Sequence, residues 1–165
     1  GQGMVKGVGF DGIVRKSVEL GVDKVVPVTA NRCVSKLSQE DATKKMDRWQ
    51  RIATAASKQC GRSRVPGIGP KLATVKEFCF FNRESDLKLI FWEEERSTRI
   101  KDLSYKNQLK SAAILIGPEG GFSSKEVENS KKYGFQSISL GPRLLRTDTA
   151  PLAAISILQD RWGDL

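Results

Sequence analysis

Apolar residues recur along this chain with two different spacings, which predict alternating helices and strands. The clearest helical pattern covers residues 38–62, where Ala42, Met46, Trp49 and Ile52 follow one another at intervals of three or four. Short apolar runs bounded by turn residues are typical of buried strands. Such runs occupy residues 22–28, 64–70, 87–92, 112–117 and 136–140. The alternation favours an α/β domain with a mostly parallel sheet.

Several helix boundaries are marked by residues that satisfy free backbone groups. Capping-box patterns pair Ser38 with Asp41, Thr74 with Glu77, and Ser123 with Glu126. Asp11 is a candidate N-cap, and glycines are placed to end helices at Gly21, Gly61 and Gly134. Further helices are therefore expected over residues 10–21, 74–81, 123–133 and 147–163.

The two ends of the chain have unusual compositions. Residues 1–9 are rich in glycine and lack a periodic pattern, so we expect a linker there. Near the other end, "APLAAISIL" is apolar nearly all round. This composition predicts that the last helix is covered on more than one side. The helix then either lies centrally in the fold or packs against a second copy of the protein.

The segment "ILIGPEGGF" (114–122) places a glycine-rich turn between a predicted strand and a predicted helix. Such a turn can present backbone N–H groups to a ligand. Gly117, Gly120 and Gly121 do not have the spacing of a dinucleotide or P-loop fingerprint. Glu119 would also repel a pyrophosphate. The loop therefore either binds something less anionic than a nucleotide phosphate or has structural value alone.

A second glycine loop follows the next predicted strand, in "SLGPRLLRTDTAPLAAI" (139–155). It carries Arg143 and Arg146 just before a helix entry that contains Asp148. In parallel α/β sheets, the loops after the strands lie at the same edge and can face one crevice. The arginines bring forked hydrogen-bond donors to that edge. Alternatively, one of them has a structural role, with Asp148 at the helix entry as its partner.

Composition narrows the classes of function. The 165 residues suit one domain, and 28 basic against 19 acidic residues give a net charge of +9. This charge favours nucleic acid as a partner, although a merely soluble basic protein has the same balance. The chain has no histidine, which excludes Ser-His-Asp and Cys-His catalysis.

Cys33, Cys60 and Cys79 share no metal-type spacing, so we expect no metal and a reducing compartment. No apolar run approaches the length of a membrane span, and we expect no membrane partner.

The two glycine loops together resemble a known family. "LIGPEGGFSSKEV" and "GFQSISLGPRLLRTDTAPLAAISILQDRWGDL" closely resemble segments of the RsmE-like 16S ribosomal RNA uridine-N3 methyltransferases, which belong to the SPOUT superfamily. Further matches lie upstream in "KSVELGVDKVVPV" and "RWQRIATAASKQCGRSRVP". The resemblance extends over residues 10–165.

The resemblance implies a SPOUT-type knotted methyltransferase domain over residues 10–165, with a C-terminal deep trefoil knot. Residues 1–9 would be a linker or the remnant of a missing N-terminal PUA-like barrel, which helps members of the family to bind RNA. The implied assembly is a homodimer, and the implied cofactor is S-adenosyl-L-methionine. The residues that would contact the cofactor are Phe91, Glu93, Ile116, Gly117, Pro118, Gly120, Gly121, Leu140, Gly141, Leu144 and Leu145.

The reaction that the resemblance implies is methyl transfer to N3 of a uridine in small-subunit ribosomal RNA. Arg143 and Arg146 are then candidates to stabilise the developing uridine anion or to hold its phosphate. Glu119 is the third candidate catalytic residue, and Glu119 or Asp148 could orient the base or a water. The residues expected to contact RNA are Gln59, Arg62, Arg64, Arg143 and Arg146.

Two other functions stay open. The protein could be a catalytically inactive RNA-binding or ribosome-assembly module that keeps the knotted fold, although the intact loops favour a live site. It could also be a related knotted methyltransferase that acts on a ribose 2′-hydroxyl or on transfer RNA. The match along most of the chain argues against that substrate. We expect the protein in the cytoplasm, or in an organelle if a transit peptide was removed.

Overall fold

A computed structural model describes residues 1–5, 9–33, 39–104 and 109–165 of the chain. The described strands form a six-stranded sheet in the order β5-β3-β1-β7-β6-β8 and a separate two-stranded sheet of β2 and β4. Every described strand pair is parallel, which confirms the predicted α/β class. The strands are β1 Gln2–Gly3, β2 Lys24–Val25, β3 Pro27–Thr29, β4 Gly67–Ile68, β5 Ala73–Thr74, β6 Leu87–Phe91, β7 Ala112–Ile116 and β8 Gln136–Ile138.

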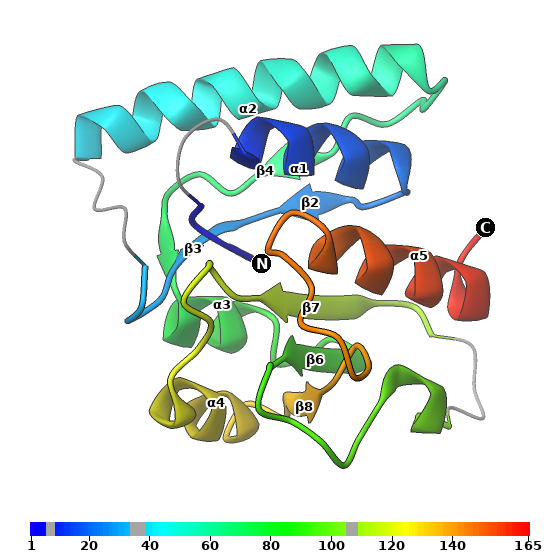
Figure 1. Cartoon of the computed structure of the whole chain (residues 1–165). Helices are drawn as coiled ribbons and strands as arrows, with labels where there is room; N and C mark the ends of the chain where they lie inside the picture. The colour runs from blue at the N-terminus through cyan, green and yellow to red at the C-terminus, as the bar shows by residue number, and fades with distance from the viewer. Residues whose placement is uncertain (6–8, 34–38, 105–108) are drawn as a thin grey trace.

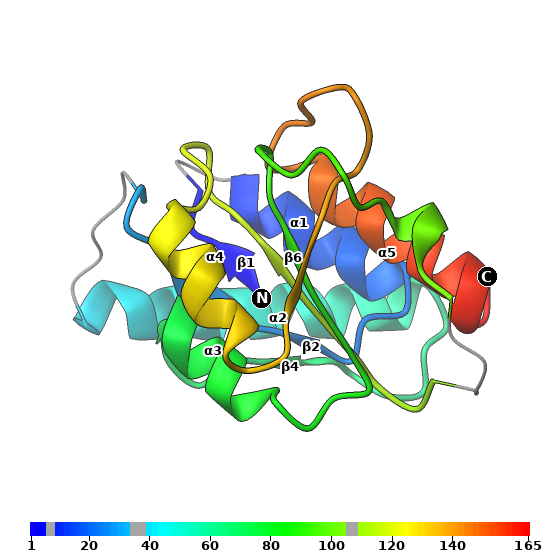
Figure 2. The same ribbon diagram turned by 90° about the horizontal axis from the view of Figure 1, so that it is seen from below.

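Helices cover both faces of the larger sheet. They are α1 Gly9–Glu19, α2 Gln39–Gln59, α3 Val75–Phe81, α4 Ser124–Lys131 and α5 Ala150–Trp162, with a short 3-10 helix, η1, over Ile100–Asp102. Figures 1 and 2 show α3 and α4 together on one face, and α1 and α5 on the other. Side chains of β6 alternate accordingly, since Leu89 packs with the α5 residue Ala154 while Ile90 packs with α3 and α4.

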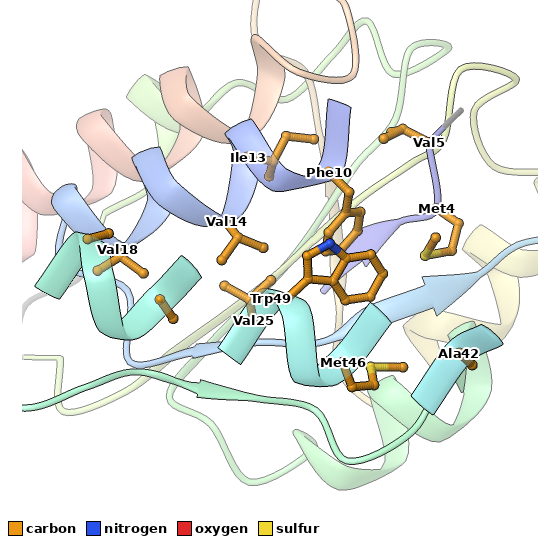
Figure 3. Packing of buried hydrophobic residues seen from close by; sticks show 12 residues of the cluster. Met4, Val5, Phe10, Ile13, Val14, Val18, Val25, Ala42, Met46 and Trp49 are labelled. Carbon is orange, nitrogen blue, oxygen red and sulfur yellow. The ribbon is translucent and has the colours of Figure 1, made fainter. Parts of the chain in front are cut away.

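A further helix, α2, lies outside α1 and forms an additional layer. Helix α2 packs on α1, and Figure 3 shows Phe10 and Trp49 meeting between these two helices, close to Met4. The two ring centroids are 4.2 Å apart. Asp11 strengthens this contact, because its carboxylate accepts hydrogen bonds from the Trp49 indole and the Arg48 guanidinium. In the parts of the chain that are described, no helix is long and apolar enough to cross a membrane.

Within the described residues 1–5, the structure differs from the linker that was expected over residues 1–9. Gln2–Gly3 is a strand inside the larger sheet, where Gln2 pairs with Pro27 of β3 and with Ile116 of β7. The next two side chains, Met4 and Val5, are buried. A two-residue strand is too short to show a periodic pattern, which is why the sequence did not reveal it.

Two further expectations are corrected. Residues 22–28 hold two strands rather than one, because β2 and β3 belong to different sheets. Helix α1 begins at Gly9, so Asp11 lies in its first turn and is not the N-cap. The first turn suits a carboxylate because free N–H groups and the positive end of the helix dipole lie there.

Most other helix boundaries are confirmed. Thr74 with Glu77, and Ser123 with Glu126, form reciprocal capping boxes. Backbone φ angles of +87°, +76° and +82° at Gly21, Gly61 and Gly134 place these glycines in the left-handed region, as expected after a helix. The capping box expected at Ser38 lies outside the described residues.

Candidate functional site

The loops that follow β6, β7 and β8 line one cavity of about 780 Å³. Because these strands are parallel neighbours, their carboxyl ends lie at one edge of the sheet, and Figure 2 shows the three loops rising from that edge. All the predicted cofactor-binding residues line this cavity, and so do Glu119, Arg143, Arg146 and Asp148. The structure thus gathers these residues in one place, while their individual roles stay predictions.

The loop after β7 is folded tightly against the protein. The Gly121 N–H donates to the Pro118 carbonyl at 2.9 Å, and Gly121 has a φ of +67°. A Cβ at Gly121 would lie 1.8 Å from Oε1 of Glu93, in the loop after β6. Glycine is therefore required both by the backbone conformation and by the carboxylate that lies against it.

Arg32, which follows β3, joins the loops after β6 and β7. Its Nη1 donates to the Gly120 carbonyl at 3.3 Å and lies 3.8 Å from Oε1 of Glu93. The Arg32 side chain is 47% exposed, so this ion pair adds little stability. Its contribution is geometric, because one guanidinium contacts two walls of the cavity. Nothing in the local sequence pattern around Arg32 pointed to this contact.

Glu95 organises the loop after β6. Its carboxylate accepts hydrogen bonds from the hydroxyls of Ser137 in β8 and Ser97, both at 2.6 Å. These bonds, together with backbone N–H donors of Ser97 and Thr98, lower the pKa of Glu95 to about 2. Glu95 does not line the cavity. It ties the loop that carries Glu93 to the neighbouring strand.

The loop after β8 is more open. Gly141 has a φ of +119°, and a Cβ built there would meet nothing within 4 Å. Arg143, Leu144 and Arg146 are exposed. Within the described residues, neither arginine side chain has a hydrogen bond or an ion pair. The loop therefore presents two uncommitted guanidinium groups at the mouth of the cavity.

The cavity lining combines apolar, acidic and basic groups. Ile116, Leu140 and Leu145 provide apolar surface. The charged residues of the lining are Glu93, Glu94, Arg96, Glu119, Arg143, Arg146 and Asp148. Such a mixture can hold an apolar ring, a cation and an anion at neighbouring positions.

The residues from the end of α2 that were expected to contact RNA lie elsewhere. Gln59, Arg62 and Arg64 are absent from the lining of the cavity. The Arg62 guanidinium donates to the carbonyls of Val18 and Val22 at 3.0 and 2.8 Å, and pairs with Asp23 at 3.0 Å. Arg62 therefore holds the end of α1, and this structural role leaves it poorly placed to bind a phosphate. Gln59 and Arg64 are exposed, and an RNA contact for them stays a prediction.

Sequence analysis missed the contribution of the N-terminal residues to the site. Val5 and Gly9 line the cavity. Gly3 contacts the loop after β7, because a Cβ there would lie 2.3 Å from the Pro118 nitrogen. Two glycines around a polar residue, "GQG", were the one available signal of a close backbone approach, and the same pattern is common in linkers.

Comparisons with known proteins agree with this geometry. The sequence model of a family described as "RNA methyltransferase domain" matches residues 1–159. Ribosomal RNA small subunit methyltransferase E of Buchnera aphidicola subsp. Schizaphis graminum is 38% identical over 92% of this chain and 60% of the relative. The protein of that name from Bacillus subtilis is 34% identical over 94% of this chain and 62% of the relative. The chain thus spans about three fifths of the length of these curated relatives.

Solved structures give the same result. A ribosomal RNA small subunit methyltransferase E from Neisseria gonorrhoeae, bound to S-adenosyl methionine, matches with a TM-score of 0.89 and 37% identity, over 99% of this chain and 66% of that one. The SpoU methyltransferase AviRb from Streptomyces viridochromogenes is only 16% identical, with a TM-score of 0.54 over 96% of this chain and 58% of that one, and shows the fold alone. These matches confirm the predicted SPOUT-type fold class, while the trefoil knot stays a prediction.

Proposed function

The chain belongs to the RNA methyltransferase domain family, and from that premise we propose that it transfers a methyl group from S-adenosylmethionine to N3 of a uridine in small-subunit ribosomal RNA. The observation that carries this proposal is the convergence of the three loops after β6, β7 and β8 on one cavity. The relatives named above are small-subunit ribosomal RNA methyltransferases, and one of them was solved with S-adenosyl methionine.

The cavity has the size and chemistry that this cofactor needs. A volume of about 780 Å³ lies within the usual range for small-molecule sites. Ile116, Leu140 and Leu145 would contact the adenine, and the glycines after β7 and β8 leave backbone groups accessible. Glu93 and Glu119 line the cavity and would supply negative charge to the positively charged sulfonium of the cofactor. The cofactor would supply the electrophilic methyl group.

The chain's own residues must then stabilise negative charge on the uridine and accept its N3 proton. Loss of the N3 proton leaves negative charge on the uracil, which Arg143 and Arg146 are placed to stabilise from the mouth of the cavity. With no histidine in the chain, the proton must pass to a carboxylate, lysine, tyrosine, arginine or water. Glu119 and Asp148 are the carboxylates of the second and third loops that line the cavity. Holding the base near the methyl group supplies much of the remaining acceleration.

Two measurements test this function. Calorimetry with S-adenosylhomocysteine is expected to show binding, and absence of heat at high ligand concentration would favour the inactive assembly module. Labelled methyl transfer to small-subunit RNA or particles, followed by nucleoside mass spectrometry, is expected to yield 3-methyluridine. A 2′-O-methyl product, or transfer RNA as the only acceptor, would overturn the proposed substrate and favour the related knotted enzymes.

We also propose the C-terminal knot. Its support is the path of the chain after β8: the Ser139 N–H donates to the Thr98 carbonyl at 2.8 Å, and Ser139 forms an isolated parallel bridge with Arg99. The chain then reaches the loop after β7, where the Thr147 hydroxyl bonds the Gly117 carbonyl. The segment 139–147 therefore contacts both the loop after β6 and the loop after β7.

A homodimer is proposed from the surface of α5. Pro151, Ala154 and Ile155 are buried against the rest of the chain, whereas Ile157 in the helix is 38% exposed and Leu144 in the loop after β8 is 82% exposed. These exposed apolar side chains suit contacts with a second copy of the protein. We expect Ile157→Asp to shift sedimentation from dimer to monomer, and Phe81→Asp, at an exposed residue of α3, to leave it unchanged. A monomeric parent protein would refute the dimer.

A PUA-like barrel that assists RNA binding, and location in the cytoplasm, stay predictions of the family resemblance. The chain spans about three fifths of the length of these relatives.

A further inference from the structure

The first strand contacts both glycine loops of the cavity through a short chain of hydrogen bonds. The Gln2 side chain, in β1, donates from Nε2 to the Thr147 hydroxyl at 3.2 Å. The Thr147 hydroxyl donates to the Gly117 carbonyl at 2.7 Å. Gln2, Thr147 and Gly117 thus connect the centre of the sheet with the loop after β8 and the loop after β7.

The direction of every bond in this chain is determined. A carbonyl can only accept, so the single proton of the Thr147 hydroxyl goes to Gly117 and its lone pairs face Gln2. Gln2 must therefore present its NH2 group, which also donates to the Gly3 carbonyl at 3.1 Å. A carboxylate at position 2 could make neither bond, and a valine at position 147 would break the chain.

This arrangement leaves one polar atom unsatisfied. Gln2 is only 3% exposed, and its Oε1 has no hydrogen-bond partner among the described residues. A buried unpaired carbonyl oxygen destabilises a fold, so an apolar side chain would serve packing as well or better. Gln50 provides the contrast, because both ends of its amide are used, on the Pro66 carbonyl and the Ile68 N–H, each at 3.0 Å.

Gly3 shows that the contact between β1 and the loop after β7 is close. A Cβ at Gly3 would lie 2.3 Å from the nitrogen of Pro118 and 2.7 Å from the carbonyl carbon of Gly117. The strand and the loop therefore touch through their backbones, and the Gln2–Thr147 chain adds a lateral link to the other loop.

We propose that Gln2 and Thr147 are positioning residues, which hold the two glycine loops at the separation that the ligand of the cavity requires. Their hydrogen bonds serve the alignment of the loops rather than the stability of the fold. This inference rests on the proposed function in so far as the ligand is an S-adenosyl compound. The link itself belongs to the ligand-free protein and can be tested without any ligand.

The first experiment measures calorimetric affinity for S-adenosylhomocysteine together with the thermal midpoint of unfolding. Thr147→Val and Gln2→Met are each expected to weaken binding roughly five- to tenfold, the equivalent of one lost hydrogen bond. Thr147→Ser keeps the hydroxyl and is expected to restore most of the affinity. The midpoint of Gln2→Met is expected to stay close to that of the parent protein, because the substitution also removes an unsatisfied oxygen.

Matched controls distinguish an effect on the alignment of the two loops from a general loss of stability. Thr54→Val removes a comparable bond, from the Thr54 hydroxyl to the Gln50 carbonyl at 3.0 Å, inside α2 and away from the cavity. Gln50→Met removes an amide that is fully used. Both controls are expected to lower the unfolding midpoint and to leave cofactor affinity unchanged. Parent-like affinity in Thr147→Val and Gln2→Met would overturn the inference while leaving the proposed function intact.

A second experiment keeps the inference testable if the parent protein binds no S-adenosyl compound. Hydrogen exchange of the ligand-free protein should become faster in both segments 117–122 and 141–147 when Thr147→Val or Gln2→Met is introduced. The exchange of α2 should stay unchanged. Unaltered protection in both loops would refute the link, and that result does not depend on which ligand the cavity takes.

Discussion

The two glycine loops that line the cavity differ in how they are held. In the loop after β7, Pro118, Gly121 and Phe122 are buried, and the turn closes through a backbone hydrogen bond. In the loop after β8, Pro142, Arg143, Leu144 and Arg146 are exposed. The first loop is thus part of the core and forms a preformed wall. The second is attached at its ends and presents its side chains outward.

This difference indicates that the two loops serve different ligands. A preformed wall built into the core suits the proposed cofactor. An exposed loop with two uncommitted arginines suits an RNA substrate that approaches from solvent. Changes in the loop after β8 should therefore affect methyl transfer, whereas changes around the loop after β7 should affect stability and cofactor binding.

The largest effect is expected from Arg146→Ala, which tests the exposed loop. Removal of one group that stabilises developing negative charge typically lowers kcat about 100-fold or more. Cofactor affinity should stay near that of the parent protein, as measured by calorimetry beside a methyl-transfer assay. Arg15→Ala, at an exposed arginine of α1, is the charge-matched control. Normal turnover of Arg146→Ala would show that this residue has no role in the reaction. It would also contradict the assignment of methyl transfer to the loop after β8.

Gly3→Ala tests the buried wall. The new Cβ would meet the backbone of Pro118 at 2.3 Å, and neither backbone can move without disturbing the sheet. We expect the free energy of unfolding to fall by about 1–3 kcal/mol, as for other overpacked cores. Urea denaturation measures the change. Gly12→Ala, at a helical glycine with nothing within 4 Å of a new Cβ, should instead stabilise the protein by up to about 1 kcal/mol. Equal effects of the two substitutions would contradict this account.

Gly121→Ala should have a smaller effect on stability and a selective effect on binding. The left-handed conformation costs an alanine about 1–2 kcal/mol, and the Glu93 carboxylate must also move away. Gly61→Ala carries the same backbone strain in open space, with φ at +76°. Both variants should lose similar stability, but only Gly121→Ala should bind S-adenosylhomocysteine more weakly. Equal affinities in the two variants would show that the contact with Glu93 does not matter to the cavity.

The smallest expected effect concerns the pH dependence contributed by Glu95. Its pKa is about 2 in the folded protein against an ordinary value of 4.5. The stabilisation is therefore fully present above pH 4.5 and is lost as the pH falls towards 2. The effect is small because the carboxylate is only partly buried, so solvent screens its interactions. Thermal unfolding should be measured between pH 2 and 6. As the pH falls, the midpoint of unfolding should decrease more for the parent protein than for Glu95→Gln. Parallel pH profiles would contradict the role given to Glu95.

Most of the element boundaries could be predicted from local patterns. The capping boxes at Thr74 and Ser123 and the terminating glycines depend on contacts within a few residues, so the sequence carries them directly. The alternation of apolar runs and helical patterns likewise predicted a parallel α/β sheet. The loops at 116–121 and 139–148 were recognised because both follow predicted strands, and parallel strands bring such loops to one edge.

Contacts between distant segments could not be predicted in the same way. Nothing local to Arg32 indicates that it contacts Gly120 and Glu93, about 90 and 60 residues away in the chain. The carbonyl partners of Arg62 at Val18 and Val22 were missed for the same reason, because they lie about 40 residues away in the chain. An RNA contact of Arg62 stays a prediction.

The sequence by itself determined which residues form the two glycine loops, where the helices begin and end, and that the chain can use no histidine chemistry. Only the tertiary structure decided that Gln2 and Gly3 belong to the sheet, that Gly3 contacts the loop after β7, and that Val5 lines the cavity. The physical reason is that a strand in the middle of a parallel sheet obtains its hydrogen bonds and its burial from neighbours far along the chain. Two paired residues suffice for that, and two residues are too few to leave a pattern of their own.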